Sequence, residues 1–257
     1  MDAIAESVLV GPHAVLEALR AGRRTLERIF LARKRPDPRI AEIVRLARIR
    51  GVPVKQEGGE RFGELSKGLA HQGVLATVSE AAYEDPFELV ARIKASARLP
   101  LLVLLDGIQD PQNLGAIIRT VEAAGADGLF IPKHRAAGIT SAVAKASAGA
   151  VEHLPVARVS GLPAFLKWLK DQGIWILGAD PVAPRSLYDI DLRVSLALVI
   201  GGEHRGLTAL VRQRCDLLAS VPMRGRLASL NAAASAAVFL FEIRRQRDST
   251  THSSANR

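Results

Sequence analysis

Residues 101–105, Leu-Leu-Val-Leu-Leu, carry an apolar side chain at every position. A strand that is apolar on both faces is typical of a parallel sheet covered on both sides. Further short apolar runs follow, with helical patterns between most of them. These predicted strands span residues 128–131, 154–156, 174–177, 196–200 and 218–221. The pattern predicts an α/β domain with a mainly parallel sheet between layers of helices.

Upstream of this domain, residues 26–79 alternate short apolar runs with helical stretches and predict a smaller α/β unit. Its predicted elements are a helix over 13–19, strands over 26–31, 52–54 and 74–78, and helices over 37–50 and 59–68. A stretch with one amphipathic helix, 87–97, and no strand follows. We therefore predict a domain over 1–80, a linker over 81–98 and a second domain over 99–247.

The C-terminal part of the chain is alanine-rich and then polar. We predict a final, tightly packed helix from about Ser229 to Arg245, whose residues Phe239 and Phe241 expose apolar surface for a second subunit. Residues 248–257 lack periodicity and predict a disordered tail.

The composition fits a folded, unexported protein. Apolar residues make up 48% of the 257 residues and charged residues 24%, as in globular domains. No run approaches the roughly 18 uncharged apolar residues of a membrane span, and the first residues are acidic where a secretory signal is basic. A lone cysteine, Cys215, excludes an intrachain disulfide and a multi-cysteine metal cage. We expect a cytoplasmic protein without a metal site or a membrane partner.

Charge favours a nucleic-acid partner. The net charge is +9 and the sequence pI is near 10.3, with 27 arginines against 8 lysines. Residues 20–50 hold 11 basic groups against the acids Glu27, Asp37 and Glu42. The planar guanidinium suits phosphate oxygens. Solubility alone is the other explanation of this charge.

Common cofactor motifs are absent from the sequence. No two of the 21 glycines are two residues apart, so the G-x-G-x-x-G dinucleotide fingerprint is missing, and no Walker P-loop occurs. The chain also lacks a G-x-S-x-G elbow and an H-E-x-x-H zinc pair. Nicotinamide dehydrogenases, P-loop NTPases and α/β-hydrolases are therefore disfavoured.

Polar side chains follow the strand at 101–105. Asn113 stands where a helix N-cap would, and capping is its simplest role. Arg119 lies six residues later, about 240° around an ideal helix, so the two side chains converge only if Asn113 belongs to the loop. A solvated surface arginine is the alternative role of Arg119.

Two later segments have the same strand-to-helix character. Gly201, where a ligand could approach the backbone closely, and Glu203 follow the strand at 196–200. Alternatively, Glu203 stands at the start of a helix because the helix dipole stabilises a carboxylate there. In the third segment Ser229 is the simplest N-cap, which leaves Asn231 inside an apolar turn without a structural role.

The three segments together resemble the motifs of the SpoU (TrmH) family of RNA ribose 2′-O-methyltransferases. They read N-L-G-x-x-x-R from Asn113, G-G-E-x-x-G-L from Gly201 and V-P-M-x-G-x-x-x-S-L-N from Val221. Residues 11–15 (Gly-Pro-His-Ala-Val) and 71–74 (His-Gln-Gly-Val) resemble the substrate-binding front domain of bacterial 23S ribosomal RNA guanosine-2′-O-methyltransferases. The sequence departs from the family pattern at two places. One is the bulky pair His204-Arg205 after Glu203, and the other is the run of alanines over 232–234.

The resemblance implies an L30e-like front domain and a SPOUT domain with a trefoil knot, which is an exception to the rule against knots. It implies S-adenosylmethionine as the methyl donor, 23S ribosomal RNA as the substrate, guanosine as the methylated nucleoside, and a homodimer. Cofactor binding maps to Gly201, Val221 and Leu230. Catalysis maps to Asn113, Arg119, Glu203, Ser229 and Asn231.

In this family the arginine that matches Arg119 is proposed as the base for the ribose hydroxyl, with Glu203, Asn113 and Asn231 orienting it. An arginine is a poor base because its pKa exceeds 12. Orientation and electrostatic stabilisation are equally open roles.

Two rival functions remain. The first is a non-catalytic RNA-binding dimer, against which stands a full polar set that we expect to be buried at strand ends. The second is a transfer RNA ribose 2′-O-methyltransferase, against which stands the front domain of about 80 residues that the resemblance assigns to ribosomal RNA enzymes.

Overall fold

The structure is a computed structural model, and it describes residues 7–32, 37–66, 68–96, 98–203 and 205–254. The chain forms two compact units. The first comprises Met1–Ala82, Leu114–Arg119 and Gly138–His153. The second comprises Tyr83–Asn113, Thr120–Ala137 and Leu154–Arg257. No helix in the described ranges is long and apolar enough to cross a membrane.

The first unit is built on a four-stranded sheet with the order β1-β4-β2-β3. Strand β4 is antiparallel to β1 and β2, and β2 is parallel to β3. Its elements are β1 (Ser7–Val10), α1 (Pro12–Ala21), β2 (Leu26–Ala32), α2 (Pro38–Ile49), β3 (Val54–Glu57), α3 (Gly59–Ser66), β4 (Val74–Val78), α6 (Ser141–Ala146) and the 3-10 helix η1 (Ala150–Glu152).

Two strands of the first unit differ from the prediction. Strand β1 was not predicted, because its four residues are too few to show a period. Strand β3 begins at Val54 rather than Val52, because Pro53 has no N–H group to donate to the sheet. The Pro53 carbonyl still accepts a hydrogen bond from Ile29 N at 2.9 Å. Its residues 54–57 lie at the sheet edge, where Lys55 and Gln56 are exposed and no apolar pattern marks them.

A buried ion pair joins the N-terminal part of the first unit to its segment 138–153. Arg24 Nε lies 3.0 Å from Glu152 Oε2, and the two side chains are 6% and 1% exposed. Burial raises the pKa of the Glu152 carboxyl even though Arg24 opposes the shift. Nearby, His153 Nε2 lies 2.8 Å from Glu17 Oε2. Residues 138–153, which we predicted as part of the second domain, therefore pack with the N-terminal residues.

The second unit contains a six-stranded sheet with the order β10-β8-β9-β5-β6-β7, and every neighbouring pair is parallel. The predicted parallel sheet is confirmed. The elements are α4 (Pro86–Lys94), β5 (Leu101–Asp106), β6 (Gly128–Pro132), β7 (Val156–Val159), α7 (Leu162–Asp171), β8 (Trp175–Ala179), η2 (Leu187–Asp189), β9 (Leu196–Gly201), α8 (Ala209–Arg214), β10 (Leu217–Ala219) and α9 (Ala232–Ser254). Helix α5 (Pro111–Ala123) begins and ends in this unit.

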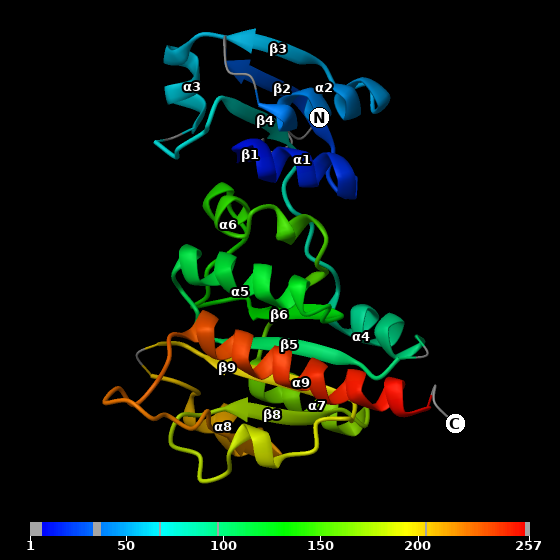
Figure 1. The fold of residues 1–257 in the computed structure, drawn as a ribbon, viewed down its shortest axis with the longest axis vertical. Coiled ribbons are helices and arrows are strands. Elements are labelled where there is room, and N and C mark those ends of the chain that lie inside the picture. Colours follow the sequence, from blue (N-terminus) through cyan, green and yellow to red (C-terminus); the bar gives the residue numbers. More distant parts are fainter. Residues whose placement is uncertain (1–6, 33–36, 67, 97, 204, 255–257) are drawn as a thin grey trace. The chain divides into compact units, whose positions relative to one another are not determined.

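Helices cover both faces of this sheet. Leu102 and Leu104 of β5 form one core cluster with residues of α4, α7 and α8. On the opposite face α9 crosses in front of β5, β9 and β8 (Figure 1) and packs against β9. All six residues of β5 are buried, as its continuous apolar run predicts.

Helix α9 starts and ends later than predicted. It begins at Ala232, not Ser229, and extends to Ser254, so residues 248–254 are helical where we predicted a disordered tail. No glycine or proline interrupts these residues, and Ser249 Oγ donates to the Arg245 carbonyl. Residues 255–257 lie outside the described part of the chain.

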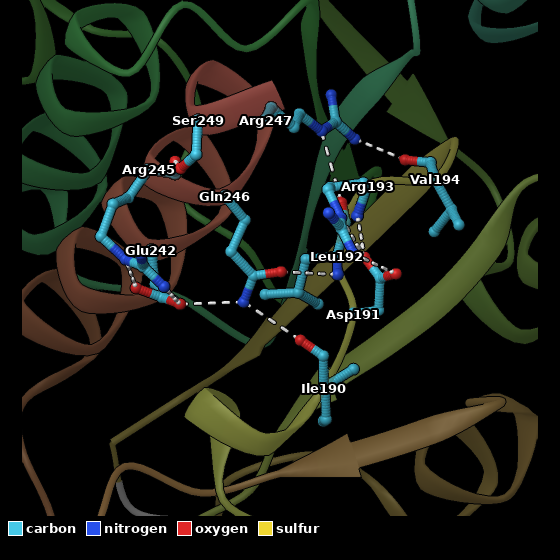
Figure 2. Close-up of polar contacts among 10 residues, drawn as sticks. All are labelled: Ile190, Asp191, Leu192, Arg193, Val194, Glu242, Arg245, Gln246, Arg247 and Ser249. Carbon is cyan, nitrogen blue, oxygen red and sulfur yellow. Dashed lines mark hydrogen bonds and ion pairs between the residues drawn. The ribbon is translucent and has the colours of Figure 1, made fainter. Parts of the chain in front are cut away.

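The second half of α9 is attached to the segment that precedes β9 (Figure 2). Gln246 accepts a hydrogen bond from Leu192 N at 2.9 Å and donates to the Ile190 carbonyl at 3.0 Å. Arg247 donates to the Val194 carbonyl at 2.6 Å, and burial lowers its pKa to about 10. These contacts fix α9 along the sheet and so fix where its N-terminus lies.

Candidate active site

A cavity of about 330 Å³ opens at the carboxyl ends of β8, β9 and β10. Its walls are the residues that follow these three strands, the loop residues 201–203 and 205–207, and the first turns of α9, including Phe239. Parallel sheets bind ligands at this edge, and the volume is within the range of small-molecule sites. All three predicted cofactor-binding residues, Gly201, Val221 and Leu230, line the cavity, as do Glu203 and Ser229.

Three glycines shape the loop of the second motif. A Cβ on Gly201 would lie 2.5 Å from Gly206 O, and one on Gly202 would lie 2.8 Å from Gly107 O. Gly206 has φ +59° and donates to the Gly202 carbonyl at 2.8 Å. The space into which a Cβ of Gly201 would point is thus filled by the loop itself, while Gly201 also lines the cavity. These glycines allow a tight turn that shapes the cavity wall.

The loop of the third motif ends in a cap that differs from the prediction. Asn231, not Ser229, is the N-cap residue of α9, since Asn231 Oδ1 accepts a hydrogen bond from Ala234 N at 2.7 Å. Asn231 therefore has the structural role that we thought it lacked, while its side-chain NH₂ group has no partner among the described residues. Ser229 lies in the loop and lines the cavity.

The first motif lies inside α5. Asp110 is the N-cap, because Asp110 Oδ2 accepts from Asn113 N at 2.9 Å, so Asn113 is a helical residue and not the cap that we considered. With both Asn113 and Arg119 in α5, the helical period places them on different faces, and the condition for their convergence is not met. Arg119 is exposed and clusters with the first unit.

The predicted polar set is open to solvent. Arg119, Glu203, Ser229 and Asn231 are exposed and Asn113 is half-buried, so the expectation of a buried set is wrong. The reason is that the loops of the second and third motifs extend past the strand ends. His204 lies outside the described residues.

Two aspartates that we did not predict support the cavity. Asp180, 7% exposed and directly after β8, lines the cavity, and its Oδ2 lies 2.9 Å from Arg212 Nε. Asp106, at the end of β5, accepts from Thr208 N at 2.7 Å and so connects the loops of the first and second motifs. Both could have been found by asking which polar residues end the predicted strands. No group of three metal-ligating side chains occurs within the described ranges.

Comparison with known families gives two matches along the chain. Residues 100–241 match the sequence model of the SpoU rRNA methylase family. Residues 8–84 match the substrate-binding domain of RNA 2′-O ribose methyltransferases. The chain belongs to the SpoU rRNA methylase family. This confirms the resemblance of the motifs, and S-adenosylmethionine is the methyl donor in this class of RNA 2′-O-ribose methyltransferases.

Individual relatives agree with this assignment. The chain is 43% identical to an uncharacterized tRNA/rRNA methyltransferase of Synechocystis, with 93% of this chain aligned and 62% of the relative spanned. It is 38% identical to the 23S rRNA (guanosine-2′-O-)-methyltransferase RlmB of Pseudomonas aeruginosa, with 92% of this chain and 95% of the relative covered. The fold is similar to the SpoU methyltransferase AviRb from Streptomyces viridochromogenes in complex with AdoMet, with a TM-score of 0.77, 28% identity, and 95% and 91% of the two chains covered.

Proposed function

We propose that this protein transfers the methyl group of S-adenosylmethionine to the 2′-hydroxyl of a guanosine ribose in 23S ribosomal RNA, in the cytoplasm. The observation that supports it best is the cavity at the ends of β8, β9 and β10, which is formed by the loops of the second and third family motifs. An RlmB relative that the chain aligns with over nearly its whole length supports the choice of substrate.

The cavity fits the proposed cofactor. Ile200, Val221 and Leu230 offer apolar walls, and the backbone of residues 201–203 and 205–206 offers polar groups. We propose that Gly201, Val221 and Leu230 hold the adenosine and methionyl parts. When bound, the cofactor supplies an electrophilic methyl group on a sulfonium.

Residues of this chain act on the ribose. We propose that Arg119 contacts the 2′-hydroxyl and that Glu203, Asn113, Ser229 and Asn231 orient the ribose. The Asn231 carbonyl oxygen is occupied by capping α9, which leaves its NH₂ group as a donor. A guanidinium stabilises the developing alkoxide by charge, without accepting a proton. The proton of the 2′-hydroxyl passes to solvent water, because the polar residues of the site are open to solvent.

The front domain supplies RNA contacts. Several arginines of residues 20–50 are already paired: Arg20 with Glu17 and Glu42, Arg24 with Glu152, and Arg39 with Asp37. By contrast Arg45 and Arg48 are exposed on α2 and have no partner among the described residues. We propose that these two bind phosphate groups.

We propose a knot and a dimer as well. The chain leaves β9, returns as β10 beyond β8, and crosses back as α9 to pack on β9, which is the crossing that a knot requires. For the dimer, Leu227 is 76% exposed and Phe241 is 51% exposed, beside an open site that a second subunit would complete. Phe239 does not contribute, since it is buried in its own chain, contrary to our expectation. Light scattering tests the dimer: a mass near 27.5 kDa at micromolar concentration would exclude it.

A transfer RNA substrate is the second candidate, because the Synechocystis relative is named for both RNA classes. Two experiments test the proposal. Calorimetric titration should show binding of S-adenosylmethionine and none of NAD or ATP. Mapping of 2′-O-methyl groups in cells with and without the gene should show a site in 23S ribosomal RNA that disappears, whereas loss of a site in transfer RNA alone would favour the second candidate.

A further inference from the structure

The loop that follows β6 carries three consecutive exposed basic residues, Lys133, His134 and Arg135. Within the described residues, the side chains of Lys133 and Arg135 form no hydrogen bond or ion pair. Two cations at the opposite edge of the sheet are paired: Arg98 with Asp127, and Lys170 with Asp216. The cations after β6 are therefore available to an external anion.

The backbone of this loop is strained and anchored. Arg135 has φ +55°, a left-handed conformation that costs a residue with a Cβ about 1 kcal/mol or more. Lys133 N donates to the Val159 carbonyl and Ala137 N donates to the Ile108 carbonyl, each at 2.9 Å. The basic side chains thus stand on a loop held at both ends, and strain of this kind is frequent at ligand sites.

The loop lies at the same edge of the sheet as the cavity. Leu104 of β5 pairs with Phe130 of β6 and with Val199 of β9, so these three residues share one level. Lys133 is three residues beyond Phe130, and Gly202 is three residues beyond Val199. Because β5 lies between β6 and β9, two strand spacings of ~4.8 Å, or about 10 Å, separate Lys133 from Gly202.

We infer that Lys133 and Arg135 bind phosphate groups of the RNA strand next to the nucleotide that is methylated. The inference rests on the proposed function, because it assumes that an RNA strand reaches the cavity. Phosphates are the polyanion that matches two unpaired cations on a fixed loop, and contacts to them position a strand without reading its sequence. The loop would set the direction in which the RNA leaves the site.

The test uses variants of the full-length protein. Lys133→Ala and Arg135→Gly are combined, since glycine removes the guanidinium and adopts the left-handed conformation without strain. Arg135→Lys keeps the charge and serves as the rescue. The matched control is Lys167→Ala with Arg214→Ala, which also removes two exposed cations whose side chains have no described partner, on α7 and α8. Filter binding of 23S ribosomal RNA fragments over a salt series, S-adenosylmethionine titration and single-turnover methylation are measured for each.

For the variant with both loop cations removed, we expect the slope of log K against log salt to fall by about 1.4 to 1.8, at 0.7–0.9 per phosphate. The KM for RNA should rise while the rate at saturating RNA stays within about threefold of wild type, because a phosphate contact stabilises ground and transition states equally. Cofactor affinity should be unchanged, and Arg135→Lys should restore most of the slope.

The inference is overturned if this variant has the same salt slope as the control pair. It is also overturned if the RNA does not bind the wild-type protein. Failure of the proposed function is a different outcome, in which wild-type protein binds RNA but transfers no methyl group to it; the salt slopes then still decide the role of Lys133 and Arg135.

Discussion

Gly201 and Gly206 are in direct backbone contact across the loop of the second motif: a Cβ on Gly201 would lie 2.5 Å from the Gly206 carbonyl oxygen. Real Cβ atoms do not approach a backbone atom so closely, so any side chain at position 201 forces the loop to open. Because this loop forms one wall of the cavity, the shape of the proposed cofactor site depends on the absence of a single methyl group.

Gly201→Ala should therefore abolish S-adenosylmethionine binding. Gly225→Ala is the matched control, since Gly225 lies in the exposed loop of the third motif and a Cβ there would meet nothing within 4 Å. Calorimetric titration of both variants measures the difference. Equal affinities in the two variants would show that the cavity is not the cofactor site.

Arg119→Ala should abolish methyl transfer and leave S-adenosylmethionine affinity nearly intact, because the proposed contact of Arg119 is with the ribose. Its side chain is exposed and forms no hydrogen bond or ion pair with a described residue, so the free energy of unfolding should change by no more than about 0.5 kcal/mol. Single-turnover methylation with labelled donor measures the effect. Turnover within about threefold of wild type would mean that Arg119 is an ordinary solvated residue.

Replacing both Arg45 and Arg48 by alanine should impair RNA binding, whereas Arg119→Ala impairs methyl transfer. RNA binding weakens and its salt dependence flattens by about 0.7–0.9 per lost phosphate contact, since both exposed guanidinium groups are unpaired within the described residues. Arg20→Ala is the control, because Arg20 already pairs with Glu17 and Glu42. A salt slope equal to that of the control would remove α2 from the RNA interface.

Arg24→Ala should destabilise the protein by about 3–5 kcal/mol at neutral pH, because it leaves the Glu152 carboxylate buried without its partner. Burial already holds the pKa of Glu152 above its ordinary value, so the folded state binds more protons than the unfolded state as pH rises from 4.5. The free energy of unfolding therefore falls as pH rises through the folded-state pKa of Glu152. Removing Arg24 raises this pKa further and so widens the pH range over which stability is lost. Urea unfolding should show a smaller loss at pH 5 than at pH 8; a loss independent of pH would contradict this account.

Cys215 should resist thiol reagents in the folded protein. Burial, with Asp216 adding to it, raises the pKa of the thiol to about 12, which leaves about one thiolate in ten thousand at pH 8. Reaction with a chromogenic disulfide should be slow in buffer and fast in urea. Rapid labelling of the folded protein would refute the predicted burial.

Local patterns were enough to predict five of the six strands of the second unit to within two residues at each end, whereas β7 begins at Val156, where the strand predicted over 154–156 ends. The continuous apolar run of β5 requires burial on both faces, and this constraint belongs to the sequence itself. The bounds of the edge strand β3 were predicted wrongly, because solvent on one side allows polar residues such as Lys55 and Gln56 in a strand.

Helix starts were harder to predict, since several residues compete for one cap. Asp110 precedes Pro111, which is favoured in the first turn, and this makes Asp110 rather than Asn113 the cap of α5. At α9, Ser229 and Asn231 are both good caps, and only the packed position of the helix selects Asn231.

The sequence by itself determined the parallel α/β architecture, the family and three residues that line the cavity, Gly201, Val221 and Leu230, because apolar periodicity and motif spacing are local properties of the chain. Tertiary structure alone decided which loops meet. The order β10-β8-β9-β5-β6-β7 brings the ends of β8, β9 and β10 together around one cavity, and it places the loop after β6 at the same edge. Strand order depends on contacts between residues far apart in the chain, whose free energy no local pattern encodes.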